Sequence, residues 1–335
     1  MTGLSRGDVR GARISALGVY VPERVLTNDE ISQSLDTSDE WITTRTGIRE
    51  RRIARPDQAT SDLATEAAQA ALASVDFDPE LLDLVIVTTI TPDMIFPATA
   101  SIVTHNIGAT RAGAFDLEAG CTGFVYGLAV ATAFVSANIY RNVLVLGAEV
   151  LSRSLDWGDR GTCVLFGDGA GAVLVTPTDN GSIFSFDLGN DGSGAKHLGI
   201  PAGGSRLPAS HETVNDHMHF MKMNGGEVFK FATRAVVESC EKVLADAGLA
   251  VADVDLFVPH QANIRIIETA GKRLGFRKDQ VFANLERYGN TSCASIPLCL
   301  AEAVASGRLK KGDTLLMTGF GAGLTWGSCL TKWDL

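Results

Sequence analysis

Three residues of different chemical type could act together in this chain: Cys121, His260 and Asn290. Cys121 follows Gly120 and begins a run of small and apolar residues that predicts a helix. Because a helix N-terminus stabilises negative charge, we expect this thiol to be more nucleophilic than a free cysteine. A neutral histidine beside such a cysteine can activate the thiol or polarise a thioester carbonyl. The combination is a candidate catalytic site built around a cysteine nucleophile.

The surroundings of His260 and Asn290 support this interpretation. His260 follows an apolar strand at residues 256–258, and Pro259 is expected to end the hydrogen-bonding ladder of that strand. Asn263 lies one turn further along the chain, and Asn290 stands in the run YGNTS. A glycine-rich run at residues 319–327 predicts a tight turn, whose backbone N–H groups could face a substrate.

Other reactive side chains are expected to be structural. We interpret the remaining cysteines as buried apolar side chains, namely Cys163, Cys240, Cys293, Cys299 and Cys329. His211, His217 and His219 lie close together but have no helical HExxH pattern and no cysteine partner, so a solvated loop is expected and no metal. The glycine-rich run at residues 166–172 has no P-loop lysine and precedes a strand-like run, so it is also interpreted as structural. No cofactor is expected.

An internal repeat indicates how the reactive residues are positioned. Residues 64–89 align without a gap on residues 236–261, and each copy reads as a helix, a short loop and an apolar strand. Short apolar strands are typical of a sheet covered on both faces. A second block repeats around Cys121 and Asn290, with one residue inserted. The chain is therefore predicted to consist of two related α/β halves, residues 1–180 and 181–335.

The repeat places Cys121 and Asn290 at equivalent positions, each where the chain enters a helix. His260 lies just beyond its strand, where the first half has Thr88. Ligands of α/β sheets gather at the carboxyl ends of strands and at helix N-termini. Two halves packed face to face could therefore share one site.

Composition limits the classes of protein that remain. The chain has 335 residues, 45% hydrophobic and 20% charged, with a net charge of −10, which argues against a general nucleic-acid binder. Six cysteines without paired spacing and an N-terminus without a long apolar stretch predict a reduced, cytoplasmic protein. Residues 119–140 carry no charge, but their glycines and polar residues favour a buried helix over a membrane span.

Together the motifs resemble a known family, the β-ketoacyl-acyl-carrier-protein synthases III of the thiolase superfamily. The resemblance covers nearly the whole chain and rests on residues 36–54, 119–124, 159–173, 221–232, 258–267, 287–295 and 319–328. It implies a five-layered αβαβα fold of two duplicated halves and, usually, a homodimer. It also implies that an acyl group passes from acyl-CoA to the cysteine and then to a carbanion formed by decarboxylation of malonyl-acyl-carrier protein.

The resemblance further implies roles for individual residues. Cys121 would be the nucleophile, His260 and Asn290 would stabilise the enolate, and the backbone N–H groups of Cys121 and Ala322 would form the oxyanion hole. Many relatives have glycine where this chain has Ala322, but only the backbone is needed there. CoA contacts would come from Thr37, Trp41, Arg45, Arg160 and Asn263, and carrier-protein contacts from Lys230, Arg265, Lys272 and Arg273. Phe96 would line the acyl pocket of the neighbouring subunit.

Several alternatives stay open on the sequence. A condensing enzyme of the same fold that serves secondary metabolism, or that uses a CoA-bound extender, would have the same three residues. A biosynthetic thiolase is disfavoured because the turn at residues 319–323 has no second cysteine. A non-catalytic acyl- or CoA-binding relative would be expected to lack one of the three residues. A Cys–His hydrolase remains possible on the residues alone. The acyl primer, acetyl or short branched, is not fixed.

Overall fold

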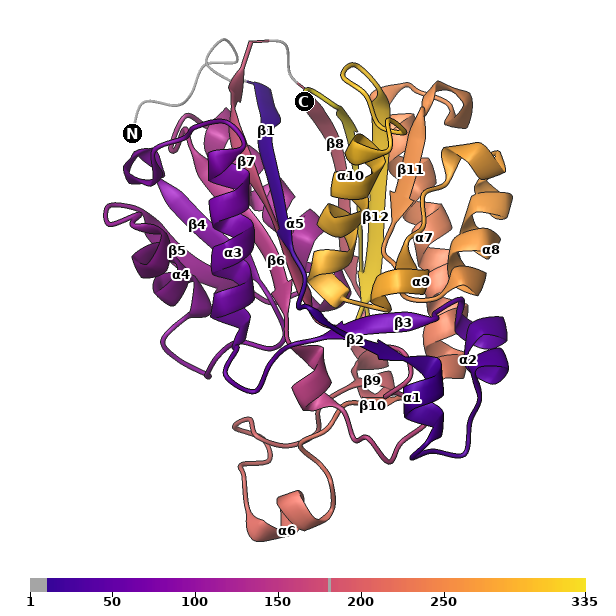
Figure 1. The fold of residues 1–335 in the computed structure, drawn as a ribbon. Helices are drawn as coiled ribbons and strands as arrows, with labels where there is room; N and C mark the ends of the chain where they lie inside the picture. The colour runs from indigo at the N-terminus through magenta and orange to yellow at the C-terminus, as the bar shows by residue number, and fades with distance from the viewer. Residues whose placement is uncertain (1–10, 180–181) are drawn as a thin grey trace.

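Two β-sheets lie side by side in the computed structural model, which describes residues 11–179 and 182–335 (Figure 1). The first sheet has the strand order β1-β7-β6-β4-β5, and the second has the order β8-β13-β12-β11. The strands are β1 (Gly11–Tyr20), β4 (Leu84–Thr88), β5 (Gly113–Leu117), β6 (Val143–Glu149), β7 (Gly169–Thr178), β8 (Ile183–Asn190), β11 (Leu256–Pro259), β12 (Thr314–Gly321) and β13 (Thr325–Lys332).

The two sheets repeat one pattern of strand pairing. β6 pairs parallel with β4 and antiparallel with β7, just as β12 pairs parallel with β11 and antiparallel with β13. β1 lies antiparallel to β7, and β8 lies antiparallel to β13. This common topology confirms the duplicated halves expected from the sequence repeat. The expected boundary at residues 180 and 181 lies outside the described residues.

Helices cover the sheets in three layers, so the five-layered α/β arrangement is confirmed (Figure 1). One pair of helices packs on the outer face of the first sheet, one pair lies between the sheets, and one pair covers the outer face of the second sheet. In that order the helices are α3 (Thr60–Ala73) and α4 (Thr99–Ile107), α5 (Gly123–Ser136) and α10 (Ser295–Ala305), and α7 (Gly225–Ala247) and α8 (Ile264–Leu274).

The middle layer is apolar on all sides because it packs against a sheet on each face. Glycine lets α5 approach the first sheet closely: a Cβ at Gly127 would lie 2.8 Å from side-chain atoms of both Thr88 and Val145. The uncharged segment at residues 119–140 is therefore a buried helix with its flanking turns. Among the described residues, no helix combines the length and apolarity that crossing a membrane requires.

Smaller elements connect the layers and gather at one end of the sheets (Figure 1). A lobe carrying α6 projects from this end. The elements are β2 (Arg24–Thr27), β3 (Glu50–Ile53), β9 (Leu198–Gly199), β10 (Lys222–Met223), α1 (Asn28–Ser32), α2 (Asp39–Thr46), α6 (His211–Asn215) and α9 (Leu285–Tyr288). Short 3₁₀ turns are η1 (Pro79–Leu81), η2 (Gly120–Thr122), η3 (Leu151–Ser154), η4 (Gly192–His197), η5 (Val251–Asp253), η6 (Lys278–Gln280) and η7 (Ser292–Ala294).

Local structure differs from the sequence-based expectation at three points. Cys121 lies in the 3₁₀ turn η2 rather than in the helix itself, and α5 begins two residues later. Pro259 does not end its ladder, because it still pairs with Thr318 and the N–H of His260 donates to the Thr318 carbonyl at 2.8 Å. Proline is tolerated there because the next residue, His260, supplies the donor to Thr318. The histidine-rich segment, expected to be a loop, contains the short helix α6. The glycine-rich run at residues 166–172, in contrast, enters β7 directly, as expected from the strand-like residues that follow it.

Candidate active site

Cys121 lies deep in the molecule at the entrance to α5, and its side chain is 7% exposed. The turn that holds it needs glycine at Gly120, which has a φ of +54°, and a Cβ there would lie 2.7 Å from the backbone N of Ala322. A Cβ at Gly321 would lie 2.3 Å from the backbone N of Cys121. The end of β12 thus packs directly against the cysteine backbone.

His260 is held from the side facing away from the cavity. Its Nδ1 lies 2.7 Å from the Oγ of Ser295, the first residue of α10, and this Oγ also accepts from the N–H of Gln261 at 3.4 Å. The hydroxyl proton is therefore available to Nδ1, so the ring carries its own proton on Nε2. Nε2 is buried without a hydrogen-bond partner. Burial lowers the pKa of His260 to about 3, so the ring is a neutral donor.

Asn290 is oriented by its own loop. The N–H of Ser292 donates to the Asn290 Oδ1 at 2.9 Å, which leaves the amide NH₂ group free to donate elsewhere. The backbone of Asn290 bridges to Phe166, because its N–H donates to the Leu165 carbonyl at 2.8 Å and its carbonyl accepts from Gly167 at 3.0 Å. This bridge joins the loop before η7 to the segment that leads into β7.

The three predicted residues come together in one cavity of about 600 Å³, which Phe320 and Gly321 also line. The ring centroids of Phe320 and His260 are 5.5 Å apart in an edge-to-face arrangement. A second hollow, of about 670 Å³, reaches Cys121 from another side and is lined by Ile90, Leu198 and Met221 among others. Cys121 therefore stands where two hollows meet, with two neutral N–H donors in the first.

The Cys121 thiol is less acidic than the sequence suggested. Burial raises its pKa to about 12, a hydrogen bond with Ser292 offsets part of this rise, and the nearby carboxylate of Glu149 adds to it. The N-terminus of α5 favours the thiolate, but the buried surroundings oppose charge more strongly. The sequence-based expectation considered only the helix, and the structure adds the cost of desolvation.

The residues expected to contact CoA lie together around α2. The guanidinium carbons of Arg45 and Arg160 lie 4.4 and 4.9 Å from the centroid of the Trp41 ring. Asn263 lines the cavity of Cys121, and its amide donates to the Arg45 carbonyl at 3.0 Å. Thr37 lies near these residues, just before α2, and its hydroxyl is buried without a hydrogen-bond partner. A series of contacts thus links Trp41 through Arg45 and Asn263 to the cavity of the cysteine.

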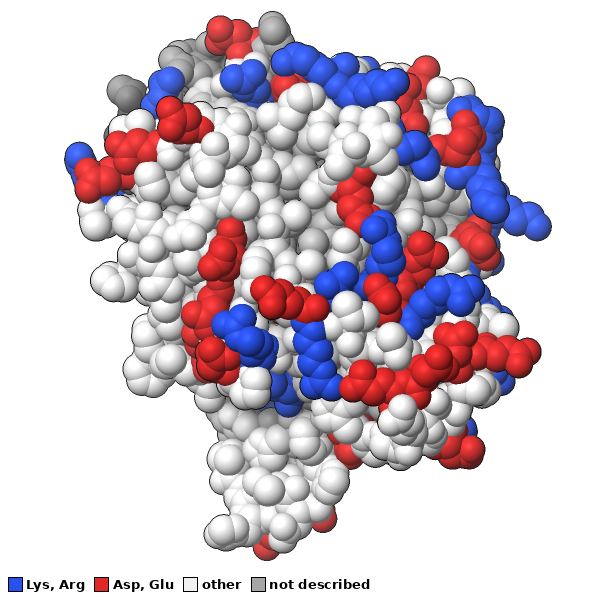
Figure 2. Space-filling view, viewed as in Figure 1, with Lys and Arg blue, Asp and Glu red and all other residues white. Residues whose placement is uncertain are grey.

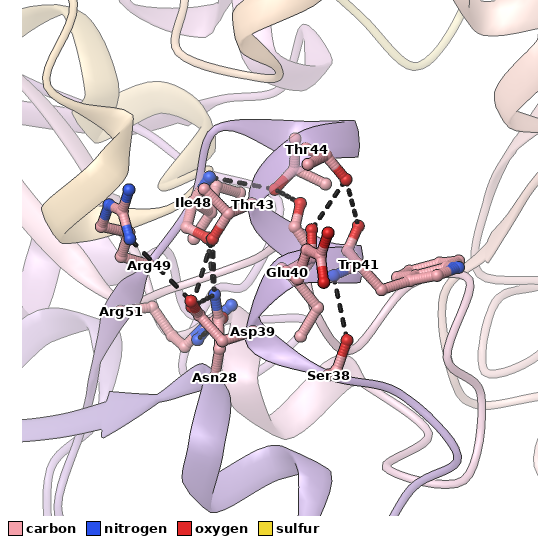
Figure 3. A network of polar contacts seen from close by, with 12 residues as sticks. Asn28, Ser38, Asp39, Glu40, Trp41, Thr43, Thr44, Ile48, Arg49 and Arg51 are labelled. Carbon is pink, nitrogen blue, oxygen red and sulfur yellow. Dashed lines mark hydrogen bonds and ion pairs between the residues drawn. The ribbon is translucent and has the colours of Figure 1, made fainter.

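A polar network fixes α2 on the side opposite the indole (Figure 3). The amide of Asn28 donates to Asp39 and to the Ile48 carbonyl, both at 2.8 Å, while its oxygen accepts from Arg51 at 2.9 Å. Ser38 caps the helix by accepting from the N–H of Trp41 at 3.1 Å. Figure 3 shows the indole pointing away from this network, so the anchoring of α2 does not involve the ring.

The four predicted carrier-protein residues lie on two packed helices, Lys230 on α7 and the others on α8. Arg265, Lys272 and Arg273 are exposed, and Lys230 forms an ion pair with Glu227 at 2.7 Å. Arg273 also ties the helices together by donating to the Thr233 carbonyl at 2.9 Å. Acidic and basic side chains are interleaved on the face seen in Figure 2, whereas the α6 lobe shows little charge on this face.

Phe96 does not line the cavity within its own chain. Its side chain is 83% exposed, and neither hollow at Cys121 includes it. Ala322, in contrast, lines the second hollow next to Gly120 and Cys121. Among the histidines of the α6 lobe, His217 pairs with Asp156 at 2.8 Å and His219 lies 2.9 Å from the Thr213 hydroxyl. No cluster suited to a metal ion occurs in the described part of the chain.

Sequence reasoning missed residues that orient the reactive groups. Ser295 fixes the tautomer of His260, Ser292 contacts both Asn290 and Cys121, and Glu149 lies fully buried beside them. The run TSCAS after Asn290 was part of the resemblance, but nothing in its composition signals which hydroxyl contacts which partner. Glu149 could have been noticed in the sequence, because it is a carboxylate directly after an apolar strand.

Comparisons with known proteins agree with this geometry. Residues 115–192 match the family model for 3-oxoacyl-[acyl-carrier-protein] synthase III, and residues 244–333 match the model for the C-terminal part of that family. The chain is 56% identical to the β-ketoacyl-[acyl-carrier-protein] synthase III of Caldanaerobacter subterraneus over 324 residues, covering 96% of this chain and 98% of the relative.

Solved structures give the same result. The synthase III of Thermus thermophilus is 50% identical with a TM-score of 0.90, over 96% of this chain and 99% of that one. The priming β-ketosynthase of the R1128 polyketide pathway is 39% identical with a TM-score of 0.91, over 99% of both chains. The thiolase-like fold, the acyltransferase class and the family predicted from the sequence are confirmed. The chain belongs to the 3-oxoacyl-[acyl-carrier-protein] synthase III family.

Proposed function

We propose that this protein joins a short acyl group from acyl-CoA to malonyl-acyl-carrier protein, forming a β-ketoacyl-acyl-carrier protein and thereby starting fatty-acid synthesis. One observation carries the proposal: Cys121 stands at the junction of two hollows, facing two neutral N–H donors. A cysteine so placed can hold an acyl group in one hollow while a second thioester enters through the other. No cofactor or metal takes part.

In the first half of the reaction, Cys121 attacks the carbonyl carbon of acyl-CoA and CoA leaves as a thiolate. The backbone N–H groups of Cys121 and Ala322 are the proposed oxyanion donors, because the turn of β12 packs against the turn of the cysteine. Preorganised donors of this kind stabilise the charge on the tetrahedral intermediate without reorganisation. The covalent intermediate divides one difficult condensation into two steps and predicts ping-pong kinetics.

In the second half, malonyl-acyl-carrier protein loses carbon dioxide and its thioester oxygen gains charge. The Nε2–H of His260 and the amide NH₂ of Asn290 are the proposed donors to this oxygen. Both are neutral, so they stabilise the enolate without a proton transfer. The carbanion then attacks the acyl carbon, the bond between that carbon and the Cys121 sulfur breaks, and the thiolate is released. A neutral, buried histidine suits this role better than that of a base.

The CoA nucleotide is proposed to bind at Trp41, with its adenine against the indole and its phosphates near Arg45 and Arg160. Their guanidinium groups already lie over the ring, so they are placed to pair with phosphate oxygens. The pantetheine chain would follow the cavity past Asn263 to Cys121.

Replacing Trp41 with alanine is expected to raise the KM for acyl-CoA about tenfold, since a base–aromatic stack contributes roughly 1–3 kcal/mol. The acylation rate at saturating acyl-CoA should stay close to that of the wild type, because Trp41 is remote from Cys121. Steady-state kinetics with varied acyl-CoA measures both. Tyr140→Ala is the matched control, since Tyr140 packs on Phe134 beyond the far end of α5. An unchanged KM in Trp41→Ala would contradict this nucleotide site.

The carrier protein is proposed to dock on the surface formed by Lys230, Arg265, Lys272 and Arg273. Arg265 follows Asn263 at the start of α8, so this surface adjoins the mouth of the cavity. An acidic partner would be steered to it although the enzyme as a whole carries a net charge of −10.

The acyl chain is proposed to occupy the second hollow, where Ile90, Leu198 and Met221 provide apolar surface. A homodimer would complete this pocket with Phe96 of the other subunit. Two features support the dimer: β5 is an edge strand of the first sheet, and Met94, Ile95 and Phe96 are 46%, 86% and 83% exposed. Paired edges and covered apolar patches are the usual outcome for such surfaces. The proposed location is the cytoplasm.

Incubation of the protein with acyl-CoA and malonyl-acyl-carrier protein should give β-ketoacyl-carrier protein, carbon dioxide and free CoA in equal amounts. Mass spectrometry of the carrier protein and a thiol assay for CoA test this, with acetyl-CoA, isobutyryl-CoA and longer donors compared. Release of CoA without a condensed product would instead identify a hydrolase. Condensation with malonyl-CoA, but not with the carrier-bound form, would contradict the proposed acceptor.

The likeness to the R1128 priming β-ketosynthase supports a second candidate, which is the same condensation in a polyketide pathway. That reaction would use the same residues and differ in the carrier protein and the primer. A clear preference for a polyketide carrier over the fatty-acid carrier in the same assay would favour this second function.

A further inference from the structure

Two turns of the chain meet at the proposed oxyanion hole. The nucleophile turn, residues 119–122, carries the N–H of Cys121, and the hairpin turn, residues 321–325, carries the N–H of Ala322. A Cβ at Gly120 would lie only 2.7 Å from the backbone N of Ala322. In the part of the chain that the structure describes, no backbone hydrogen bond joins the two turns. The relative position of the two N–H donors therefore depends on packing and on side chains.

Two buried hydroxyls, which we call the threonine pair, lie between these turns. Thr122 belongs to the nucleophile turn, and Thr325 ends the hairpin turn and begins β13. The Thr122 hydroxyl lies 2.9 Å from the Thr325 hydroxyl and is also within reach of the Ala119 carbonyl. The Thr325 hydroxyl lies 3.0 Å from the carbonyl oxygen of Ala119 and 3.1 Å from that of Ala322. Among the described residues, the threonine pair makes the only hydrogen bonds between the two turns.

The protons of the threonine pair link the turns in one direction. Two hydroxyl oxygens 2.9 Å apart need a proton between them, and the geometry makes Thr122 the donor. The proton of Thr325 then goes to the Ala322 carbonyl, which has no other donor among the described residues. The Ala119 carbonyl keeps the N–H of Thr122 as its own donor, at 3.2 Å. A chain of two hydrogen bonds thus runs from the nucleophile turn to the hairpin turn.

The carbonyls beside Thr325 are next to the two peptide groups that would donate to the oxyanion. The Ala119 carbonyl precedes the peptide group that carries the Cys121 N–H, and the Ala322 carbonyl follows the peptide group that carries the Ala322 N–H. Because a peptide group is planar, fixing one carbonyl limits the rotation of its neighbour. The Cys293 thiol also donates to the Gly120 carbonyl, at 3.1 Å, but this contact does not reach the hairpin turn.

We propose that Thr122 and Thr325 are positioning residues that fix the distance between the two N–H donors of the oxyanion hole. The inference rests on the acyl transfer proposed above and adds to it the groups that hold its oxyanion site in shape. Neither threonine lines a hollow at Cys121, so both act through the backbone and not on the substrate. Burying two hydroxyls is costly unless they are hydrogen-bonded, and here their partners are the two turns themselves.

The threonine pair should affect only one of the two charged oxygens in the reaction. The tetrahedral intermediate of acyl transfer would be stabilised by the N–H groups of Cys121 and Ala322, whereas the enolate would be stabilised by His260 and Asn290. These last two side chains are oriented by groups of α10 and η7, not by the threonine pair. Loss of the threonine hydroxyls is therefore expected to slow acyl transfer while decarboxylation continues.

The test compares Thr325→Val with Thr325→Ser. Valine keeps the shape of threonine but removes the hydroxyl, and serine keeps the hydroxyl. Thr325→Val is expected to acylate Cys121 about 10²-fold more slowly in single-turnover reactions, the loss that follows a misplacement of about 1 Å at a reacting centre. The acyl-CoA concentration that half-saturates acylation should not change. Carbon dioxide release from malonyl-acyl-carrier protein without a primer should also stay close to the wild-type rate, and Thr325→Ser should recover most of the acylation rate.

Infrared difference spectra of the acyl-enzyme give a second measurement, with acetyl-CoA labelled with ¹³C at the carbonyl carbon. Donors in an oxyanion hole polarise the thioester carbonyl and lower its stretching frequency. The band should therefore move to higher wavenumber in Thr325→Val and return towards the wild-type position in Thr325→Ser. A threonine that contributed only to stability would leave the band in place.

Thr331→Val is the matched control. Thr331 lies at the other end of β13, is equally buried, and donates its hydroxyl to the Ser182 carbonyl at 2.8 Å. The variant thus removes a buried threonine hydroxyl from the same strand without touching either turn. Its acylation rate and its carbonyl band should match those of the wild type.

Three results would overturn the proposal: wild-type acylation in Thr325→Val, equal fractional losses of acylation and decarboxylation in that variant, or no recovery in Thr325→Ser. If Thr325→Val does not fold, Thr122→Val takes its place and should lose acylation selectively in the same way. Failure of the wild type itself to acylate would refute the proposed function, and this outcome is distinct from an intact wild type with an unaffected variant.

Discussion

Cys121→Ser is expected to lose acyl transfer from acyl-CoA by a factor on the order of 10⁴ or more, as when the nucleophile of a covalent catalyst is removed. A serine hydroxyl is far less acidic and less nucleophilic than a thiol, and the buried site cannot ionise it. The substitution changes one atom, so the cavity with its two donors stays intact. The measurements are CoA release and condensed product, each per unit of folded protein.

The same variant should still decarboxylate malonyl-acyl-carrier protein at a measurable rate. His260 and Asn290 reach the thioester oxygen without the sulfur, so the enolate can form and be protonated by solvent. Cys240→Ser is the matched control, because Cys240 is equally buried but lies 3.7 Å from the Ser328 hydroxyl, where a serine finds a partner. Full condensation activity in Cys121→Ser would refute the assignment of the nucleophile.

His260→Ala should keep acylation of Cys121 and lose decarboxylation, which is the reverse of the result expected for Cys121→Ser. Removing one preorganised donor typically costs about 10²–10³ in rate, and the loss is expected in decarboxylation and condensation. Acylation of Cys121 should change much less, since His260 is not its base in this account. Asn290→Ala should behave in the same way. The measurements are carbon dioxide release and single-turnover acylation in each variant.

Ser295→Ala disturbs His260 less than the removal of its side chain does. It keeps the imidazole but removes the hydroxyl that fixes its tautomer, so a loss of about tenfold is expected, the worth of one hydrogen bond. Because the pKa of His260 is lowered to about 3, the ring is neutral above that pH and wild-type decarboxylation should not follow a titration near neutrality. A rate that tracks an ionisation near pH 6.5, the ordinary pKa of a histidine, would contradict the neutral donor.

The sequence predicted the fold and the placing of three candidate residues in one cavity because both follow from features that repeat. The two copies of helix, loop and strand revealed equivalent halves, and Cys121 and Asn290 occupied matching positions in them. In the structure these positions are the entrances to α5 and α10, the two helices of the middle layer. Because both helices lie between the two sheets, the topology of the fold brings their N-terminal ends together.

The orienting residues could not be predicted because their roles depend on contacts between distant segments. Ser295 lies 35 residues after His260, and only the packing of α10 beside β11 brings its hydroxyl to the ring. The acidity of Cys121 was mispredicted for a similar reason, since burial by the end of β12 is invisible in the sequence. Phe96 stays a prediction, because its proposed role belongs to a second subunit.

The anchoring of Trp41 shows the same limit. The resemblance placed an indole on a short helix, but the side chains that hold this helix come from β3, α1 and α2 (Figure 3). Arg51 is fully buried behind them and also donates to the Val164 carbonyl at 2.6 Å. This network therefore connects the proposed nucleotide site to the segment that carries Val164 and Phe166, and Phe166 in turn bridges to Asn290.

The measurement that tests the central claim most directly is the intact mass of the protein after incubation with acetyl-CoA and with isobutyryl-CoA, followed by addition of malonyl-acyl-carrier protein. We predict a mass gain of one acyl group on Cys121, absent in Cys121→Ser, that disappears as β-ketoacyl-carrier protein forms. A stable acyl adduct that malonyl-acyl-carrier protein does not remove, or an adduct that persists in Cys121→Ser, would contradict the account.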